Sequence, residues 1–197
     1  QNFKLIENKS RNTYSFSFLF SQIISKNAQV SFFVDFIKQK GWLANPLQRV
    51  YFSDIENFYI GNPNSISVYT SDENKDVFHL ADDIERLPET RTKIPFGLRF
   101  NYFLSENFTV RSYYRFYTDN WGIKSHTLKF ELPIKILNNF TLYPSYRFYH
   151  QSKADYFKPY DQHLSSSSFY TSDYDLSKFN SNQVGFGIKY VDIFTKL

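Results

Sequence analysis

The sequence predicts an all-β fold, an antiparallel transmembrane β-barrel of which about seven strands are visible. Runs of about ten residues carry different chemistry at odd and even positions, because alternate side chains of a barrel strand face lipid and lumen. Aromatic residues make up 21% of the 197 residues, which suits the aromatic girdles at both water interfaces of a barrel. No run approaches the roughly 18 consecutive apolar residues that a spanning helix needs. Any membrane crossing would therefore use strands.

The first two strands are predicted near residues 13–23 and 29–37, joined by a short link around residues 25–28. One face of the first strand is aromatic and consists of Tyr14, Phe16, Phe18 and Phe20. The second strand has an apolar face and a mixed face, the latter made of Ser31, Phe33, Asp35 and Ile37.

Five more strands follow the same alternation. They are predicted near residues 93–103, 108–117, 127–136, 140–150 and 183–190. The sixth shows the pattern most directly, because its apolar face consists of Phe140, Leu142, Pro144, Tyr146 and Phe148.

The connections are predicted to alternate in length. Tight returns fall near Ser25, Ser105 and Asn138, and longer connections begin near Lys38, Thr118 and Gln151. Outer-membrane barrels have short periplasmic turns and long extracellular loops, so the long loops, at about 38–92 and 151–180, are expected outside the cell. Single-chain bacterial barrels have an even number of strands. We therefore expect residues 1–197 to form one β-barrel domain that is incomplete at both ends.

Four segments resemble a known family. They are residues 45–52 (NPLQRVYF), 82–88 (DDIERLP), 113–123 (YYRFYTDNWGI) and 169–179 (FYTSDYDLSKF). The sequence resembles the Bacteroidota outer-membrane β-barrels catalogued as a domain of unknown function of the DUF3570 type. The resemblance implies a bacterial outer-membrane location and no assigned catalytic residues. It also implies a link to envelope proteins, namely a lipoprotein and thioredoxin-like or flavinylated partners.

The polar faces of the predicted strands carry many basic and aromatic side chains. The candidate lumen-facing residues are Arg99, Arg111, Tyr113, Arg115, Tyr117, Lys129, Lys135, Tyr143, Arg147, Tyr149 and Lys189, against the acids Asp35 and Glu131. One interpretation is a positively biased lumen that favours anionic solutes. The other is a structural network in which these residues pair with acids on other strands and fill a plugged interior. Trp121, near a strand end, is expected in an interfacial girdle.

Metal binding is not predicted. Residues Asp72, Asn74 and Asp76 have the spacing of a calcium loop with Asp83 at the twelfth position, but Val77 stands where the loop needs glycine,. A solvated acidic loop is the favoured interpretation. Two further groups lack any recognisable ligand spacing and are interpreted as exposed loop histidines. They are His79 with Asp82 and Asp83, and His150 with Asp155, Asp161 and His163.

Catalysis is not predicted either. The sequence has no Gly-rich phosphate loop, nucleophile elbow or His-Glu-x-x-His motif, and no serine at matching depth accompanies His126 on its apolar face. The absence of cysteine excludes thiolate chemistry. We expect no cofactor, and the formal charge of +4 is too modest to indicate nucleic-acid binding.

The leading hypothesis is a non-enzymatic outer-membrane β-barrel, in contact with outer-membrane lipid, that acts as a channel or as a membrane scaffold subunit of an envelope complex. One alternative is a barrel that docks redox or flavinylated envelope partners. A second alternative is a soluble, glycan-binding β-sandwich, because a sandwich strand also alternates.

Overall fold

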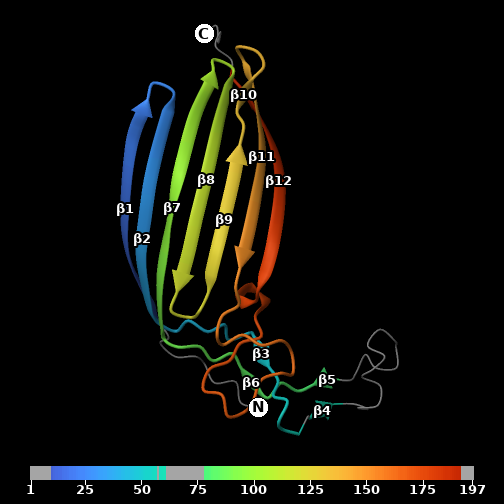
Figure 1. The fold of residues 1–197 in the computed structure, drawn as a ribbon. Coiled ribbons are helices and arrows are strands. Elements are labelled where there is room, and N and C mark those ends of the chain that lie inside the picture. The colour runs from blue at the N-terminus through green and yellow to red at the C-terminus, as the bar shows by residue number, and fades with distance from the viewer. Residues whose placement is uncertain (1–9, 57, 61–77, 192–197) are drawn as a thin grey trace, which may run out of the picture. The chain divides into compact units, whose positions relative to one another are not determined.

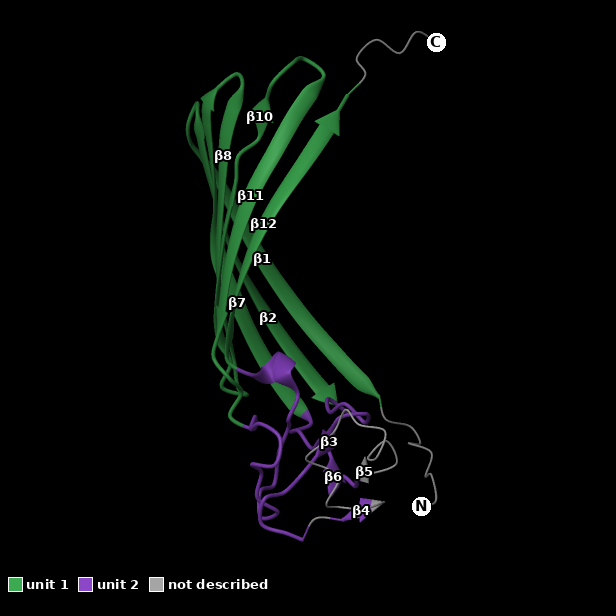
Figure 2. Cartoon of the chain, turned by 90° about the vertical axis from the view of Figure 1, so that its right-hand side faces the viewer, with its two compact units in different colours: residues 1–41, 90–155, 178–197 green, residues 42–89, 156–177 purple. Residues whose placement is uncertain are grey.

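The computed structural model describes residues 10–56, 58–60 and 78–191. The chain divides into two compact units (Figure 2). Unit 1 contains residues 1–41, 90–155 and 178–197, and unit 2 contains residues 42–89 and 156–177. In the part of the chain that the structure describes, no helix has both the length and the apolar character needed to cross a membrane.

Unit 1 is built on one antiparallel sheet whose strands lie side by side in Figure 1. Its strands are β1 (Arg11–Ser25), β2 (Ala28–Gly41), β7 (Thr90–Ser105), β8 (Phe108–Asp119), β9 (Lys124–Glu131), β10 (Ile134–Lys135), β11 (Phe140–Gln151) and β12 (Phe179–Tyr190). The spatial order is β1-β2-β7-β8, then β9 and β10, then β11-β12. The all-β, antiparallel prediction is confirmed. Among the described residues β1 and β12 are the edges of the sheet.

The fifth predicted strand is present as two segments, β9 and β10, which both pair with β8 and β11. The break falls at Leu132 and Pro133. A proline has no N–H to donate to a neighbouring strand. One strand position of the sheet is therefore occupied by two pieces of the chain.

The strand register keeps the odd-numbered residues on one face. Arg99 pairs with Tyr113, and Tyr113 pairs with Lys129. Even-numbered residues likewise pair with even-numbered ones, as Phe96 does with Phe116. Directly paired residues project from the same face of a sheet. Odd and even residues therefore form two separate faces from β1 to β12, apart from the two register shifts beside the turns after β1 and β7.

The even face is apolar and uncovered. Exposed fractions are 64% for Phe16, 48% for Leu98 and 66% for Phe186. The odd face is more covered in the middle of the sheet, where Ser31 and Thr127 are buried. Among the described residues the other two sheets, β3–β6 and β4–β5, are two-stranded. A β-sandwich needs a second sheet against the apolar face, and no sheet of comparable size is described.

Several strand ends differ from the prediction. β2 continues to Gly41 and β7 begins at Thr90, so the first long connection is residues 42–89. β11 ends at Gln151 and β12 begins at Phe179, so the second is residues 152–178. The strands run further because their terminal residues continue the pairing, as Lys40 does with Thr90.

The connection after β8 was expected to be one of the longer ones, and this was wrong. It consists of residues 120–123 only. The Asp119 side chain accepts hydrogen bonds from the backbone N–H groups of Trp121 and Ile123, each at 3.0 Å. Gly122 supplies the positive φ of 85° that closes the turn,. The Asp119 carboxylate thus stabilises a tight turn after β8, where the polar composition of the sequence had indicated a longer connection.

Unit 2 consists of the two long connections folded on each other. Its elements are β3 (Arg49–Val50), β4 (Tyr59–Ile60), β5 (Phe78–His79), β6 (Asp83–Ile84) and the 3-10 helix η3 (Tyr174–Leu176). A small core contains Val50, Phe52 and Tyr170. Bridges join Phe52 to His163 and Arg86 to Tyr170. The long loops therefore have a buried core of their own.

Candidate functional site

A hollow of about 360 Å³ lies on the odd face in the middle of unit 1. It belongs to β7, β8 and β9, whose register places Arg99, Tyr113 and Lys129 in one row across the sheet. Asn101, Arg111 and Glu131 form the next row. The lining residues are Arg99, Asn101, Arg111, Ser112, Tyr113, Lys129 and Glu131. The hollow therefore brings together side chains from three adjacent strands.

Arg99 lies against an aromatic shelf made by Phe33 and Tyr113. The two rings are stacked, with centroids 5.6 Å apart and planes within 3°. The Arg99 Cζ atom lies 5.3 Å from the Phe33 centroid and 5.8 Å from the Tyr113 centroid. Such cation-π contacts restrict the position of a guanidinium. Among the described residues no carboxylate forms an ion pair with Arg99, so its N–H donors are not committed to an acid.

The shelf depends on Gly97, which pairs with Phe33 across β2 and β7. A Cβ atom at position 97 would lie 2.8 Å from Cζ of Phe33 and would also strike the backbone carbonyl of Tyr114. The absence of a side chain thus lets the Phe33 ring lie over β7. Phe33 is 9% exposed, although the sequence placed it only on a mixed face.

Two cations at the hollow share one acid. Glu131 accepts a hydrogen bond from Nη1 of Arg111 at 3.0 Å and another from Nζ of Lys129 at 3.1 Å, through different carboxylate oxygens. The Arg111 and Lys129 side chains are 51% and 43% exposed, so water weakens both ion pairs. With Arg99, the hollow has three cations and one carboxylate. Its excess positive charge attracts anions.

The structure places all of the candidate lumen residues on the odd face and gathers four of them, Arg99, Arg111, Tyr113 and Lys129, at the hollow. The other seven lie elsewhere on that face: Arg115, Tyr117, Lys135, Tyr143, Arg147, Tyr149 and Lys189. Arg147 pairs with Lys129 in the register and covers the Tyr149 ring at 5.6 Å. Sequence reasoning missed Asn101 and Phe33 as site residues. A glycine opposite Phe33 is the signal that could have indicated the shelf.

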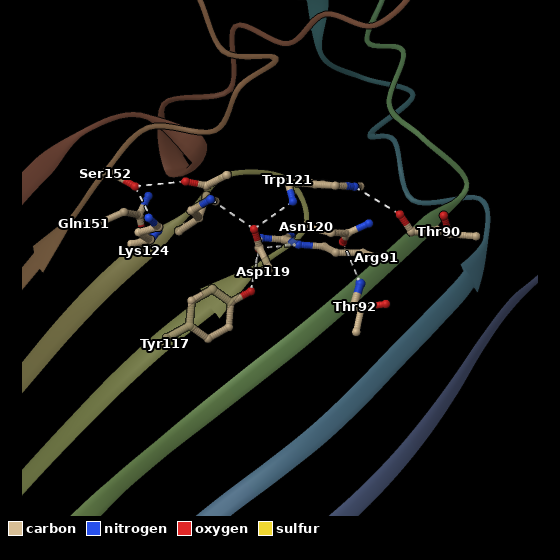
Figure 3. Close-up of polar contacts among 12 residues, drawn as sticks. Thr90, Arg91, Thr92, Tyr117, Asp119, Asn120, Trp121, Lys124, Gln151 and Ser152 are labelled. Atoms are coloured by element: carbon tan, nitrogen blue, oxygen red, sulfur yellow. Dashed lines mark hydrogen bonds and ion pairs between the residues drawn. The ribbon is translucent and has the colours of Figure 1, made fainter.

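A second polar cluster surrounds Asp119 at the end of β8 (Figure 3). Its Oδ2 accepts hydrogen bonds from Nε and Nη2 of Arg91, at 2.9 and 2.6 Å, and from the Tyr117 hydroxyl at 2.7 Å. The Arg91 guanidinium lies over the Trp121 ring at 4.3 Å. All acceptor positions of this carboxylate are engaged, so the cluster is structural. Tyr117 belongs to this cluster and not to the hollow.

Trp121 was expected in an interfacial girdle, and this was wrong. Its ring is 2% exposed, and Nε1 donates a hydrogen bond to the Thr90 carbonyl at 3.1 Å. The indole is buried because the tight turn after β8 folds it under Arg91 and onto the start of β7.

The histidines differ in environment. His163 was expected in an exposed loop, but it is 2% exposed and its Nε2 lies 3.0 Å from the Thr171 carbonyl. Burial lowers the pKa of its imidazole below the ordinary value,. The ring of His79 contacts the rings of Tyr51, Tyr59 and Tyr160. These contacts make His79 part of an aromatic cluster in unit 2.

Only one of the four calcium candidates, Asp83, lies among the described residues. Asp72, Asn74 and Asp76 lie outside the described residues. Asp83 accepts a hydrogen bond from the Tyr170 hydroxyl at 2.5 Å and pairs with Arg86 at 3.5 Å. In residues 10–56, 58–60 and 78–191 no group of three or more metal-ligating side chains is found.

The apolar face also carries polar contacts near the ends of β9, β11 and β12. His126 Nδ1 lies 2.8 Å from the Tyr114 hydroxyl, and its ring centroid is 6.3 Å from that of His150. His150 Nδ1 lies 2.6 Å from Oδ1 of Asn180. Among the described residues no hydrogen bond joins a serine to His126, and its hydroxyl partner is Tyr114.

The fold and the hollow define an all-β protein whose long-stranded antiparallel sheet has an apolar face and a basic, polar face. The chain belongs to the family described as "Protein of unknown function (DUF3570)", whose sequence model matches residues 1–196. The predicted resemblance to the DUF3570 family is thereby confirmed. Comparisons with curated proteins and with solved structures return no match.

Proposed function

We propose that the sheet forms part of the wall of an outer-membrane β-barrel, a non-enzymatic channel or membrane scaffold of an envelope assembly. One observation carries the proposal: each long strand contributes exposed, large apolar side chains at even-numbered positions to one face of the sheet. In water such a surface is a liability when it extends over a whole sheet. Strands β8, β11 and β12 have 12 residues each, enough for the roughly 9–11 residues of a spanning strand.

The edges of the sheet set a condition on the barrel. Six antiparallel pairings separate β1 from β12: β1·β2, β2·β7, β7·β8, β8·β9, β9·β11 and β11·β12. The two edge strands therefore run in the same direction. Hydrocarbon tolerates no free strand edge. An antiparallel ring thus needs an odd number of strands in addition to those described.

The odd face would line the interior of this barrel. Its basic hollow supports a channel that favours anions over cations. If acids on further strands neutralise Arg99, Arg111 and Lys129, the barrel instead serves as a scaffold. Planar-bilayer recordings separate these roles: the channel predicts anion selectivity, and a closed or cation-selective barrel leaves the scaffold.

The chain contains no cysteine, so single cysteines can test the orientation of the two faces. Phe100→Cys and Asn101→Cys change adjacent residues on opposite faces of β7. In isolated membranes we expect a charged, water-soluble thiol reagent to label Asn101→Cys and to spare Phe100→Cys. A lipid-confined fluorescence quencher should reach a probe at position 100 only. Equal labelling of both positions, or recovery of the protein in a detergent-free soluble fraction, would overturn the proposal.

A second role, docking of envelope partners, is favoured by unit 2. The two long connections form a compact unit with a buried core, whereas solvated loops need no core. The family resemblance suggests lipoprotein, thioredoxin-like or flavinylated partners. Co-purification of such a protein from detergent-solubilised membranes tests this role, and an isolated barrel that conducts ions contradicts it.

A further inference from the structure

We propose that the hollow bounded by Arg99, Arg111 and Lys129 binds a small organic anion through a carboxylate or phosphate group. The inference depends on the proposed barrel in one respect only: in the barrel, the site would face the interior. The three cations, their contacts and the hollow itself belong to unit 1 alone.

The first support is the state of Arg99. A guanidinium has five N–H donors in one plane. Cζ of Arg99 lies beside the rings of Phe33 and Tyr113, and among the described residues no hydrogen bond or ion pair engages its N–H groups. The donors at its edge stay available for an oxyanion, which guanidinium binds in bidentate fashion. Because the rings already restrict the side chain, ligand binding costs less conformational entropy than it would at a freely rotating arginine.

The second support is the shared acid. Glu131 engages Nη1 of Arg111 and Nζ of Lys129, and each cation keeps further donors. The carboxylate lowers the repulsion between the two cations without neutralising both. An anion that enters beside Arg99 would meet unused donors of all three side chains, which a lone surface lysine cannot offer.

The size of the hollow limits the ligand. Its volume of about 360 Å³ falls at the small end of the roughly 300–1,000 Å³ range of small-molecule sites. A small organic acid or a phosphorylated small molecule fits this range. The aliphatic stems of Arg111 and Lys129 can cover the apolar part of such a ligand.

The test is titration calorimetry on the purified, detergent-solubilised full chain at low ionic strength. The probes are inorganic phosphate and malonate. We expect saturable binding of at least one probe, and binding of only one assigns the anionic group. Arg99→Gln and Lys129→Gln should each weaken binding by at least about tenfold, since each removes a charge-assisted hydrogen bond. Lys189→Gln, on the same face but outside the hollow, is the control and should stay within about twofold of the wild type.

Two results would overturn the site. One is the absence of heat with both probes, which would mean that an acid already occupies the hollow. The other is equally weakened anion binding in all three variants. It would indicate that the summed positive charge of the face attracts the anion and that no specific site binds it. Circular dichroism of each variant checks that the sheet is intact. Because the titration needs no bilayer, phosphate binding together with equal labelling of Phe100→Cys and Asn101→Cys would reject the barrel and keep the site.

Discussion

Nη2 of Arg91 lies 2.6 Å from Oδ2 of Asp119, and the Asp119 side chain is completely covered. This ion pair joins the start of β7 to the end of β8. The same carboxylate binds the backbone of the following turn through Oδ1. One acidic side chain thus fixes a strand pair, a tight turn and the burial of Trp121.

Replacement of Asp119 by alanine should lower the free energy of unfolding by about 3–5 kcal/mol, because it leaves the largely covered Arg91 guanidinium without its counter-ion. Asp119→Asn should cost less, since its amide oxygen can still accept from the turn. Urea titration in micelles, followed by tryptophan fluorescence, measures both values. Trp121 is a suitable reporter because it packs against Arg91.

The matched control for Asp119 is Glu131→Ala. Its partners Arg111 and Lys129 are about half exposed, so the loss should be about 0–1 kcal/mol. Equal losses for Asp119→Ala and Glu131→Ala would show that burial of the first ion pair has no energetic importance.

Gly97→Ala should destabilise the sheet by about 1–3 kcal/mol, the usual range for overpacking. The new methyl group would strike the Tyr114 carbonyl, which belongs to the backbone of β8 and can move only if the strands separate. It would also displace the Phe33 ring and with it the support of Arg99.

The control for Gly97 is Gly187→Ala on β12. There the nearest atom to a new methyl group is Cβ of Tyr143 at 3.4 Å, so urea titration should show little change. A Gly97→Ala protein as stable as Gly187→Ala would contradict the close approach of β7 and β8.

The strands could be predicted because their signal is local. A period of two residues is visible within each strand, and it fixes which side chains share a face once neighbours pair without a shift. The ends of the strands were harder to predict from the sequence. The turn after β8 is tight because Asp119 is engaged by Arg91, 28 residues away, and no local pattern reports such a contact.

The basic residues of the candidate site could be predicted, but their grouping could not. Strand register decides that Glu131 stands between Arg111 and Lys129. The compact fold of unit 2 could not be predicted for a related reason. Val50 and Phe52 lie in a short run without a repeating pattern, and their packing partner Tyr170 comes from the other long connection.

Unit 2 should lose stability as the pH falls through about 6.5, the ordinary pKa of histidine. Burial lowers the pKa of His163, so the unfolded chain takes up a proton where the folded chain does not. Each pH unit between the folded and unfolded pKa values costs up to about 1.4 kcal/mol. Burial raises the pKa of Glu85 above its ordinary value. As the pH falls through that raised pKa, the folded chain binds a proton before the unfolded chain does. The contribution of Glu85 to stability therefore increases as the pH falls, opposite to that of His163.

His163→Gln separates the two effects, because glutamine does not titrate and its amide can still donate to the Thr171 carbonyl. Hydrogen exchange of the segment that contains Ser53, whose N–H donates to the His163 carbonyl at 2.9 Å, can be compared at about pH 5.5 and 7.5 after correction for intrinsic rates. The wild type should lose protection at the lower pH, and His163→Gln should lose less. Identical pH dependence in both proteins would exclude His163 as the cause.

Leu98→Arg tests the environment of the apolar face through the sign and size of its effect. In a bilayer an arginine at mid-depth on the lipid side of a barrel costs about 2–4 kcal/mol. In water an arginine replacing a leucine that is 48% exposed should change stability by less than about 0.5 kcal/mol.

Ile24→Arg, beside the turn after β1, and Gln29→Arg, on the odd face, are the controls, since neither change would leave a charge in mid-bilayer hydrocarbon. Urea unfolding in lipid vesicles should therefore show a large loss for Leu98→Arg alone. Three equal and small losses would mean that the aromatic face of this sheet meets water or another protein, and the proposed barrel would have to be abandoned.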